Sequence, residues 1–276
     1  MKPAPFDYVR AETLDEALGA LAEGGEEARI IAGGQSLVPM LNMRLARPSV
    51  LVDVMRIDAL SKIEPKNGRV EIGAGVRQVA LERWAALAGT LPLVAAMMPW
   101  VGHAQTRSRG TVCGSLAHAD PSAELPLALL ALDGEVKLRS KRAKRTLPAN
   151  EFFLGMMATA VAPGEMIEAI VLPAHPMGTG TAFREVARRH GDYAIVACAA
   201  IARPGGATRL AIGGVADVPQ AVALPDPSDP DFDDQLNEFA WSLNARDDLH
   251  ASARYRRDLV RTLGRRTVEE AVACRS

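Results

Sequence analysis

Cysteine is scarce in this chain of 276 residues: there are three, Cys113, Cys198 and Cys274, and they are far apart. An odd, sparse set does not build a disulfide framework, and it is typical of a reducing compartment. It also cannot ligate a four-cysteine iron–sulfur cluster. If the chain works with such a cluster, another polypeptide must carry it.

Aromatic residues are also few, at 4%, and neither sign of charge is in excess, since the formal net charge is −1. A base-stacking surface or a basic patch for nucleic acid therefore has no support, and neither does binding to an anionic membrane. The five histidines show no metal-ligand spacing and the carboxylates are scattered. We therefore expect no metal site.

Long hydrophobic runs are missing as well. The longest, residues 194–202, has the length of a strand or of half a helix, well short of a membrane span. Residues 1–7 (MKPAPFD) lack the apolar core of a signal peptide. We expect no membrane span and a cytoplasmic location. With 48% hydrophobic and 24% charged residues, the composition is that of a globular protein.

Hydrophobic periodicity predicts mixed helices and strands in the first 172 residues. Thr13 to Glu16 forms a capping-box pattern, which predicts a helix that ends at Gly24-Gly25. Further helices are predicted at 76–87 and 124–132, and strands at 28–31, 50–54, 70–72, 135–139 and 166–172. Residues 102–120 lack periodicity and predict a long functional loop. The basic cluster at 141–145 is interpreted as a solvated hairpin turn.

The segment 173–180 is rich in Pro and Gly and predicts a domain boundary. Beyond it we expect strands at 181–188, 193–202 and 209–212. Two helices, at 234–243 and 251–263, and a short third near Val268 are expected to close the chain.

Two glycine-rich segments are candidates for binding a ligand. Ala32-Gly33-Gly34-Gln35-Ser36 follows a predicted strand directly, and Gly110-Thr111-Val112-Cys113-Gly114-Ser115 lies in the irregular stretch. Glycine permits close backbone approach, and successive N–H groups and hydroxyls suit a pyrophosphate. The first segment lacks the spacing of a Rossmann turn, and a Gly-Gly pair after a strand is by itself more often a plain turn. As a pair they indicate one extended ligand held from two sides.

These segments belong to a set of motifs that resembles a known family along nearly the whole chain. The motifs are Phe6-Asp7-Tyr8, Leu14 to Ala17, Ala32 to Pro39, Gly73 to Val76, Gly102 to Arg107, Arg109 to Leu116, His118 to Pro121, Arg188 to Tyr193, Ile212 to Val215 and Tyr255 to Arg257. Their order resembles the FAD-binding, or medium, subunit of molybdenum-containing hydroxylases, the carbon monoxide dehydrogenase and xanthine dehydrogenase family.

The resemblance implies an α+β fold. Residues 1–175 would form a two-lobed FAD-binding domain of the vanillyl-alcohol oxidase type, and 177–276 a small antiparallel sheet with helices. It also implies site residues. The pyrophosphate and ribityl would be held by Ala32, Gly33, Gly34, Gln35, Ser36, Gly110, Thr111, Val112, Cys113, Gly114 and Ser115. The rest of the cofactor site would include Val101, Gly102, Thr106, Asp120, Glu124, Ile167 and Tyr193.

Some of these positions carry alternatives. Tyr193 would cover one face of the isoalloxazine, or else pack as an ordinary sheet residue. The family usually has Gly-Gly-Asn where this chain has Cys113-Gly114-Ser115, which puts the affinity for FAD or the flavin potential in question. Cys113 is expected to be a small buried thiol rather than a redox group. FAD is expected to be non-covalent, because Gln35 offers no nucleophile, and His103 and His118, on either side of the second segment, are expected to have hydrogen-bonding or structural roles.

The function implied by the resemblance is electron transfer within an oxidoreductase complex. Electrons would come from [2Fe-2S] clusters on a small subunit, after oxidation at a molybdopterin centre on a large subunit, and pass through FAD to an external acceptor. The assembly would be a dimer of heterotrimers. No general acid or base for substrate chemistry is expected on this chain. Two alternatives remain: a stand-alone flavin oxidase or dehydrogenase of the vanillyl-alcohol oxidase type, and a scaffold chain that has lost FAD.

Overall fold

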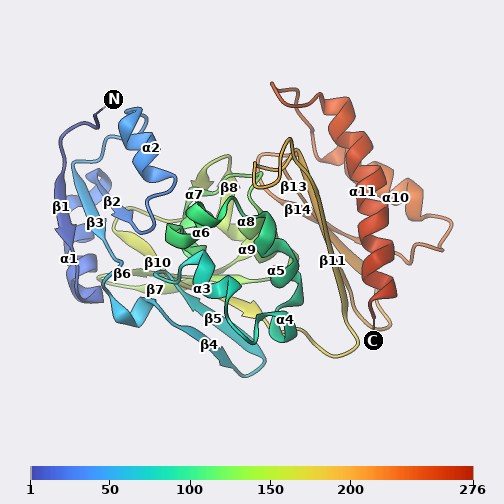
Figure 1. The fold of residues 1–276 in the computed structure, drawn as a ribbon, viewed down its shortest axis with the longest axis horizontal. Helices are drawn as coiled ribbons and strands as arrows, with labels where there is room; N and C mark the ends of the chain where they lie inside the picture. Colours follow the sequence, from blue (N-terminus) through green and yellow to red (C-terminus); the bar gives the residue numbers. More distant parts are fainter. Residues whose placement is uncertain (1, 276) are drawn as a thin grey trace.

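The computed structural model describes residues 2–275 and has an α+β architecture. Figure 1 shows an N-terminal lobe in blue at one end, a C-terminal sheet with two helices at the other, and the green and yellow elements between them. The two chain termini lie in different parts of the molecule, the first in the N-terminal lobe and the last at the end of the C-terminal helix.

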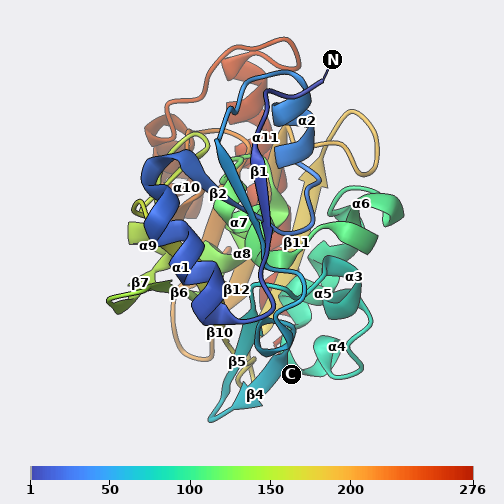
Figure 2. The ribbon, with the colours of Figure 1, turned by 90° about the vertical axis from the view of Figure 1, so that its left-hand side faces the viewer.

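The first lobe is a three-stranded parallel sheet in the order β1-β3-β2, with two helices. Its elements are β1 (Asp7–Arg10), α1 (Leu14–Gly24), β2 (Ala28–Ile31), α2 (Leu37–Asn42) and β3 (Val50–Asp53). Figure 2 shows α1 in front, beside this small sheet. The predicted cap of α1 is confirmed, because the Thr13 side chain accepts from the Glu16 N–H. The Glu16 carboxylate, however, accepts from the Glu12 N–H rather than that of Thr13.

The second lobe is built on a five-stranded antiparallel sheet in the order β4-β5-β10-β6-β7. Its strands are β4 (Ile63–Lys66), β5 (Arg69–Gly73), β6 (Glu135–Ser140), β7 (Lys144–Pro148) and β10 (Glu165–Pro173), and a two-stranded ribbon pairs β8 (Phe153–Gly155) with β9 (Ala158–Thr159). Its helices are α3 (Gln78–Glu82), α4 (Leu87–Thr90), α5 (Pro92–Met97), α6 (Ala104–Arg109), α7 (Val112–His118), α8 (Glu124–Ala131) and α9 (Ala149–Phe152). Short 3₁₀ turns lie at Gly25–Glu27, Asp58–Leu60 and Met98–Trp100.

The C-terminal region is a four-stranded antiparallel sheet with two helices. It contains β11 (Gly180–Val186), β12 (Val196–Ala202), β13 (Thr208–Gly213), β14 (Gln220–Leu224), α10 (Phe232–Ser242) and α11 (Ala253–Ala273). Every residue of β12 is buried. The cause is that α11 covers one face of this sheet, while α5 and α8 of the second lobe cover the other. The C-terminal sheet is thereby fixed against the second lobe.

The structure corrects the predicted boundaries in the N-terminal half. The helix expected at 76–87 is two short helices, α3 and α4. Leu81 and Leu87 are both buried. On one straight helix their side chains would point about 120° apart. A turn between α3 and α4 therefore lets both side chains reach the core. The loop expected at 102–120 instead contains α6 and α7. Both helices are too short to show periodicity in the sequence.

Further corrections concern the C-terminal half. The strand expected from Tyr193 begins at Val196. The helix expected at 251–263 and the short helix expected near Val268 are a single helix, α11. This helix continues through Gly264, where a Cβ would lie 3.2 Å from the Leu210 Cδ2 atom. The strands β1, β4, β8, β9 and β14 were not predicted. The hairpin around residues 141–145 is confirmed between β6 and β7.

Candidate functional site

A cavity of about 1420 Å³ lies where the two lobes and the C-terminal region meet. Its wall is formed by the loop between β2 and α2, by residues of the 101–118 segment, by the segment from 157 to 167 and by the 188–195 loop. Cavities that hold drug-sized ligands are smaller, at roughly 300–1,000 Å³. The cavity can therefore accept an extended ligand that contacts all three parts of the chain.

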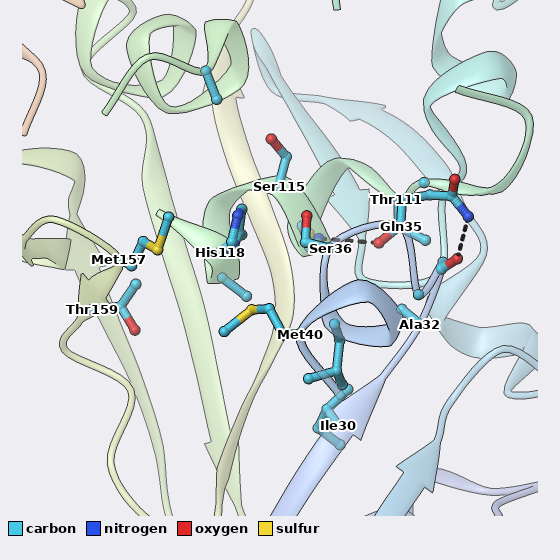
Figure 3. A pocket seen from close by; sticks show the side chains of 18 of the residues that line it. Ile30, Ala32, Gln35, Ser36, Met40, Thr111, Ser115, His118, Met157 and Thr159 are labelled. Carbon is cyan, nitrogen blue, oxygen red and sulfur yellow. Dashed lines mark hydrogen bonds between the residues drawn. The ribbon is translucent and has the colours of Figure 1, made fainter. Parts of the chain in front are cut away.

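The first glycine-rich segment forms one wall, and all five residues from Ala32 to Ser36 line it. Gly34 has φ +70°, which glycine adopts without strain. The Gln35 side-chain amide donates to the Gly33 carbonyl (3.1 Å), which folds the segment back on itself. Figure 3 shows Ala32, Gln35 and Ser36 on this wall, with Thr111, Ser115 and His118 of the second segment around the same cavity.

The two glycine-rich segments touch through their backbones. A Cβ built on Gly33 would lie 2.3 Å from the Arg109 carbonyl oxygen and 2.6 Å from the Gly110 Cα atom. No side chain fits in that space. The apposition brings the Ala32–Ser36 loop and the start of α7 together on one side of the cavity, as expected for two segments that hold one ligand.

The second segment is anchored to α3 by hydrogen bonds. The Gln78 N–H donates to the Gly110 carbonyl (2.8 Å), and the Val112 N–H donates to the Val76 carbonyl (3.0 Å). The buried Thr111 hydroxyl accepts from the Gly114 N–H (3.0 Å) and so caps α7. These bonds set the direction of α7, which presents Ser115 and His118 to the cavity.

An ion pair between Arg107 and Glu82 fixes the backbone that leads into the second segment. Arg107 bonds Glu82 with two parallel contacts, of 2.9 and 3.1 Å. The same guanidinium donates to the carbonyls of Val101 and Gly102, each at 3.1 Å. Such a fork needs a planar guanidinium, because a lysine ammonium is a single point charge. Arg107 thereby fixes the backbone of two residues that line the cavity.

Cys113 lies where the second segment meets the sheet of the second lobe. It is 2% exposed, and its thiol faces the Ile72 carbonyl. Burial raises the pKa of Cys113 to about 12. The thiol therefore stays protonated and unreactive near neutral pH, as expected from the sequence.

Two carboxyl groups lie beyond α7. Glu124 begins α8 and lines the cavity while only 4% exposed. Its burial, then the Glu185 carboxylate, and then Asp120 raise the pKa of Glu124 to about 8. Asp120 accepts from the Ser122 N–H (2.9 Å) and lines a smaller neighbouring cavity of about 390 Å³.

Tyr193 reaches the cavity from the C-terminal region, on the loop before β12. Its side chain is 54% exposed because it borders the open cavity. Partial burial of the ring against the cavity wall, and then the nearby carboxylates of Asp120 and Glu124, raise the pKa of Tyr193 to about 12, whereas a hydrogen bond with Ser36 lowers it. Gly191, with φ +85°, packs this loop onto the Gly102 carbonyl, 2.8 Å from where a Cβ would lie.

The structure brings nearly all the residues expected from the sequence to this one cavity. Those that line it are Ala32, Gly33, Gly34, Gln35, Ser36, Val101, Gly102, Thr106, Gly110, Thr111, Cys113, Gly114, Ser115, Glu124, Ile167 and Tyr193. Val112 is in the core instead, and Asp120 is in the neighbouring cavity. Ile30, Met40, Gln78, Met157 and Thr159 also line the cavity. No sequence pattern pointed to these five, because the fold alone brings them there.

The wall suits a dinucleotide with a pyrophosphate. Backbone N–H groups and the hydroxyls of Ser36 and Ser115 supply donors, and neither glycine-rich segment carries an acidic side chain. The Gln78 Oε1 atom is buried and has no hydrogen-bond partner within residues 2–275, and Gln78 lines the same wall. In the same range no three His, Cys, Asp or Glu side chains gather as metal ligands do.

Comparison with known proteins agrees with this geometry. Residues 4–175 match the family described as the FAD binding domain in molybdopterin dehydrogenase. The 6-hydroxypseudooxynicotine dehydrogenase complex subunit alpha of Paenarthrobacter nicotinovorans is 39% identical, over 99% of this chain and 96% of its own. The nicotine 6-hydroxylase medium subunit of the same organism is 37% identical, over 99% of both chains.

A solved structure has the same fold over the full length. A chain in the reconstituted CO dehydrogenase from Oligotropha carboxidovorans superposes with a TM-score of 0.93 at 31% identity, covering 99% of this chain and 100% of the other. None of the helices within residues 2–275 has the length and hydropathy that a membrane span needs.

Proposed function

Because the chain belongs to the family of FAD-binding domains of molybdopterin dehydrogenases, we propose that it is the electron-transfer subunit of a molybdenum hydroxylase complex. The fold and the family make it an FAD-binding subunit of an oxidoreductase. The proposal adds the direction of transfer: from [2Fe-2S] clusters on a partner subunit, through FAD, to an external acceptor. When bound, FAD supplies the exchange between one-electron and two-electron redox partners.

The observation that carries the proposal is the contact between the two glycine-rich segments in the wall of a cavity of about 1420 Å³. The Ala32–Ser36 loop and α7 supply N–H and hydroxyl donors on one side, and Tyr193 borders the cavity from the C-terminal region. These residues bind and orient the cofactor. Tyr193 would cover one face of the bound isoalloxazine and so exclude water from it.

The partners follow from the names of the relatives, which are a complex subunit alpha and a medium subunit. We assign two partners to this chain: a large subunit that carries molybdopterin and a small subunit that carries [2Fe-2S] clusters. The three subunits would form a cytoplasmic dimer of heterotrimers. The three scattered cysteines agree with this division, because they cannot hold the clusters on this chain.

The test is to purify the chain alone and again after co-expression with its neighbouring genes. We expect flavin absorbance that moves to the supernatant on acid precipitation, as non-covalent FAD does. The co-expressed sample should contain molybdenum and iron in a complex with the mass of two heterotrimers. Flavin retained in the pellet would contradict non-covalent binding. Oxidase activity from a lone, flavin-loaded chain would favour the stand-alone alternative, and a chain that takes up no FAD would favour the scaffold.

A further inference from the structure

Two buried carboxyl groups from different parts of the chain lie near enough to act on each other electrostatically, and one of them lines the cavity. Glu124 begins α8 in the second lobe, and Glu185 lies near the end of β11 in the C-terminal region. Their exposed fractions are 4% and 9%. The fold brings them near each other because α8 packs against β12, and Ala197 of β12 is the strand partner of Glu185. Glu124 lines the cavity, whereas Glu185 does not.

Neither group is paired with a cation among residues 2–275. Both carboxylate oxygens of Glu185 are buried without a hydrogen-bond partner in the part of the chain that the structure describes. The groups that act on Glu124 are the carboxylates of Glu185 and Asp120 and its own backbone N–H, and Tyr193 lies on the cavity side. Two adjacent negative charges without a cation are costly to bury, and pairs of this kind retain a proton.

The position of the pair determines what that proton does. Glu124 is the member that faces the cavity, so protonation turns it from an acceptor into an O–H donor. A carboxylate there would repel an anionic ligand, whereas an O–H group donates to a phosphate or carbonyl oxygen. Glu185 has no contact with the cavity and acts only through Glu124.

We propose that Glu124 presents its carboxyl to the cavity as a hydrogen-bond donor near neutral pH, and that Glu185 is a positioning residue that keeps the proton there. The inference rests on the proposed function for the identity of the ligand, which is FAD. The pKa shifts agree with this proposal. Burial first, and then the Glu185 carboxylate, raise the pKa of Glu124 to about 8, and burial raises the pKa of Glu185 to about 7. Because the two are coupled, these values belong to the pair.

The proposal gives FAD binding a specific pH dependence. Affinity is constant while Glu124 is protonated, and it falls by about tenfold per pH unit once the proton is lost. Removing the negative charge of Glu185 releases the proton of Glu124 more easily. The fall in affinity therefore begins at a lower pH in Glu185→Gln than in the native chain. In Glu124→Gln, an amide N–H replaces the O–H donor and cannot titrate, so the fall is absent.

The experiment is fluorescence titration of the full chain with FAD between pH 6 and about pH 10, a range chosen to bracket the raised pKa values of the pair. The native chain, Glu124→Gln and Glu185→Gln are compared with Glu270→Gln. Glu270 is the matched control, since it pairs with Arg184 on the opposite side of β11 and is 43% exposed. We expect the profile of Glu270→Gln to match the native one. Identical profiles for all four proteins would overturn the proposal.

A second measurement does not need FAD. Infrared spectra of the apo protein should contain the C=O stretch of a buried protonated carboxyl up to about pH 8. In Glu124→Gln only the band of Glu185 should remain, and it should disappear near pH 7, whereas in Glu185→Gln the band of Glu124 should disappear at a lower pH than in the native chain. Absence of this band in the native chain overturns the proposal even if FAD binds. A band that is present in a chain with no affinity for FAD supports the protonated carboxyl and overturns the proposed function instead.

Discussion

Gly33 and Gly110 lie in direct backbone contact, although they are far apart in the sequence: a Cβ on Gly33 would be 2.6 Å from the Gly110 Cα atom. The contact links the first lobe to the second at the wall of the cavity. We expect Gly33→Ala to push the two segments apart and to weaken FAD binding at least tenfold, because both lose their alignment on the pyrophosphate. Isothermal titration with FAD measures the loss.

The matched control is Gly19→Ala. Gly19 lies in α1, where a Cβ would meet nothing within 4 Å. This change should leave FAD affinity unaltered and raise helix stability slightly. Circular dichroism separates a local effect of Gly33→Ala from unfolding. Equal FAD affinities for a folded Gly33→Ala and the native chain would show that the contact has no part in binding.

The sequence predicted the presence of the two glycine-rich segments and of the strongly periodic elements, because glycine pairs and apolar repeats are local signals. It did not predict α6 and α7, which depend on the Thr111 cap and on the contacts of Arg107 with Glu82. It also divided α11 into two helices, since sequence alone does not show that Gly264 packs against Leu210 within one continuous helix.

The residues of the candidate site divide in the same way, into those that local sequence patterns indicate and those that depend on long-range contacts. Residues from glycine-rich and polar motifs, such as Ser36 and Ser115, were found through their composition. Gln78, Met157 and Thr159 were not, because each lies in a short helix, turn or strand whose neighbours in space are distant in sequence. The buried pairing of Glu124 with Glu185 is also a long-range contact. It depends on how α8 packs on the C-terminal sheet, which no local pattern indicates.

Ser115 offers a test of the departure from the usual Gly-Gly-Asn motif. It lies on α7 and lines the cavity. Replacing it with asparagine adds an amide donor and a carbonyl acceptor, and one further hydrogen bond contributes about 0.5–1.5 kcal/mol. We therefore expect Ser115→Asn to bind FAD roughly twofold to tenfold more tightly, measured by fluorescence titration. Ser108→Asn, on α6 and outside the cavity wall, is the control. Weaker binding by Ser115→Asn would show that serine fits this site better.

The fork between Arg107 and Glu82 should stabilise both the fold and the site. Lysine at position 107 keeps the charge but loses the two parallel bonds and at least one of the bonds to Val101 and Gly102. We expect Arg107→Lys to lower the free energy of unfolding by about 1–3 kcal/mol in urea titrations, and to weaken FAD binding. Arg184→Lys changes an ion pair with Glu270 in which both side chains are 43% exposed, and should cost less than about 1 kcal/mol. Equal losses in the two variants would contradict the structural role of Arg107.

The buried carboxyl pair should also make folding depend on pH. A carboxyl in the unfolded chain has a pKa near 4.3, whereas in the folded chain burial and the neighbouring carboxylate raise the pKa of Glu124 to about 8. The folded state therefore holds protons that the unfolded state has lost between these values. The stabilising contribution is complete below about pH 4, and it decreases as pH rises through 5, 6 and 7 toward 8, at up to about 1.4 kcal/mol per pH unit for each proton. Above that range both states are ionised and the dependence ends.

Glu185→Gln isolates this effect. The variant keeps the shape of the side chain, removes one buried titrating group and lets Glu124 ionise more easily, so its stability should decrease less between pH 5 and about pH 8 than that of the native chain. At the upper end of this range the variant should be the more stable protein, because the native chain then buries a carboxylate whose oxygens have no partner. Urea titrations at each pH, with Glu270→Gln as the exposed control, measure the difference. Parallel stability curves for the native chain and Glu185→Gln would mean that Glu185 ionises as freely in the folded chain as in the unfolded chain. Glu185 would then have no part in keeping a proton on Glu124.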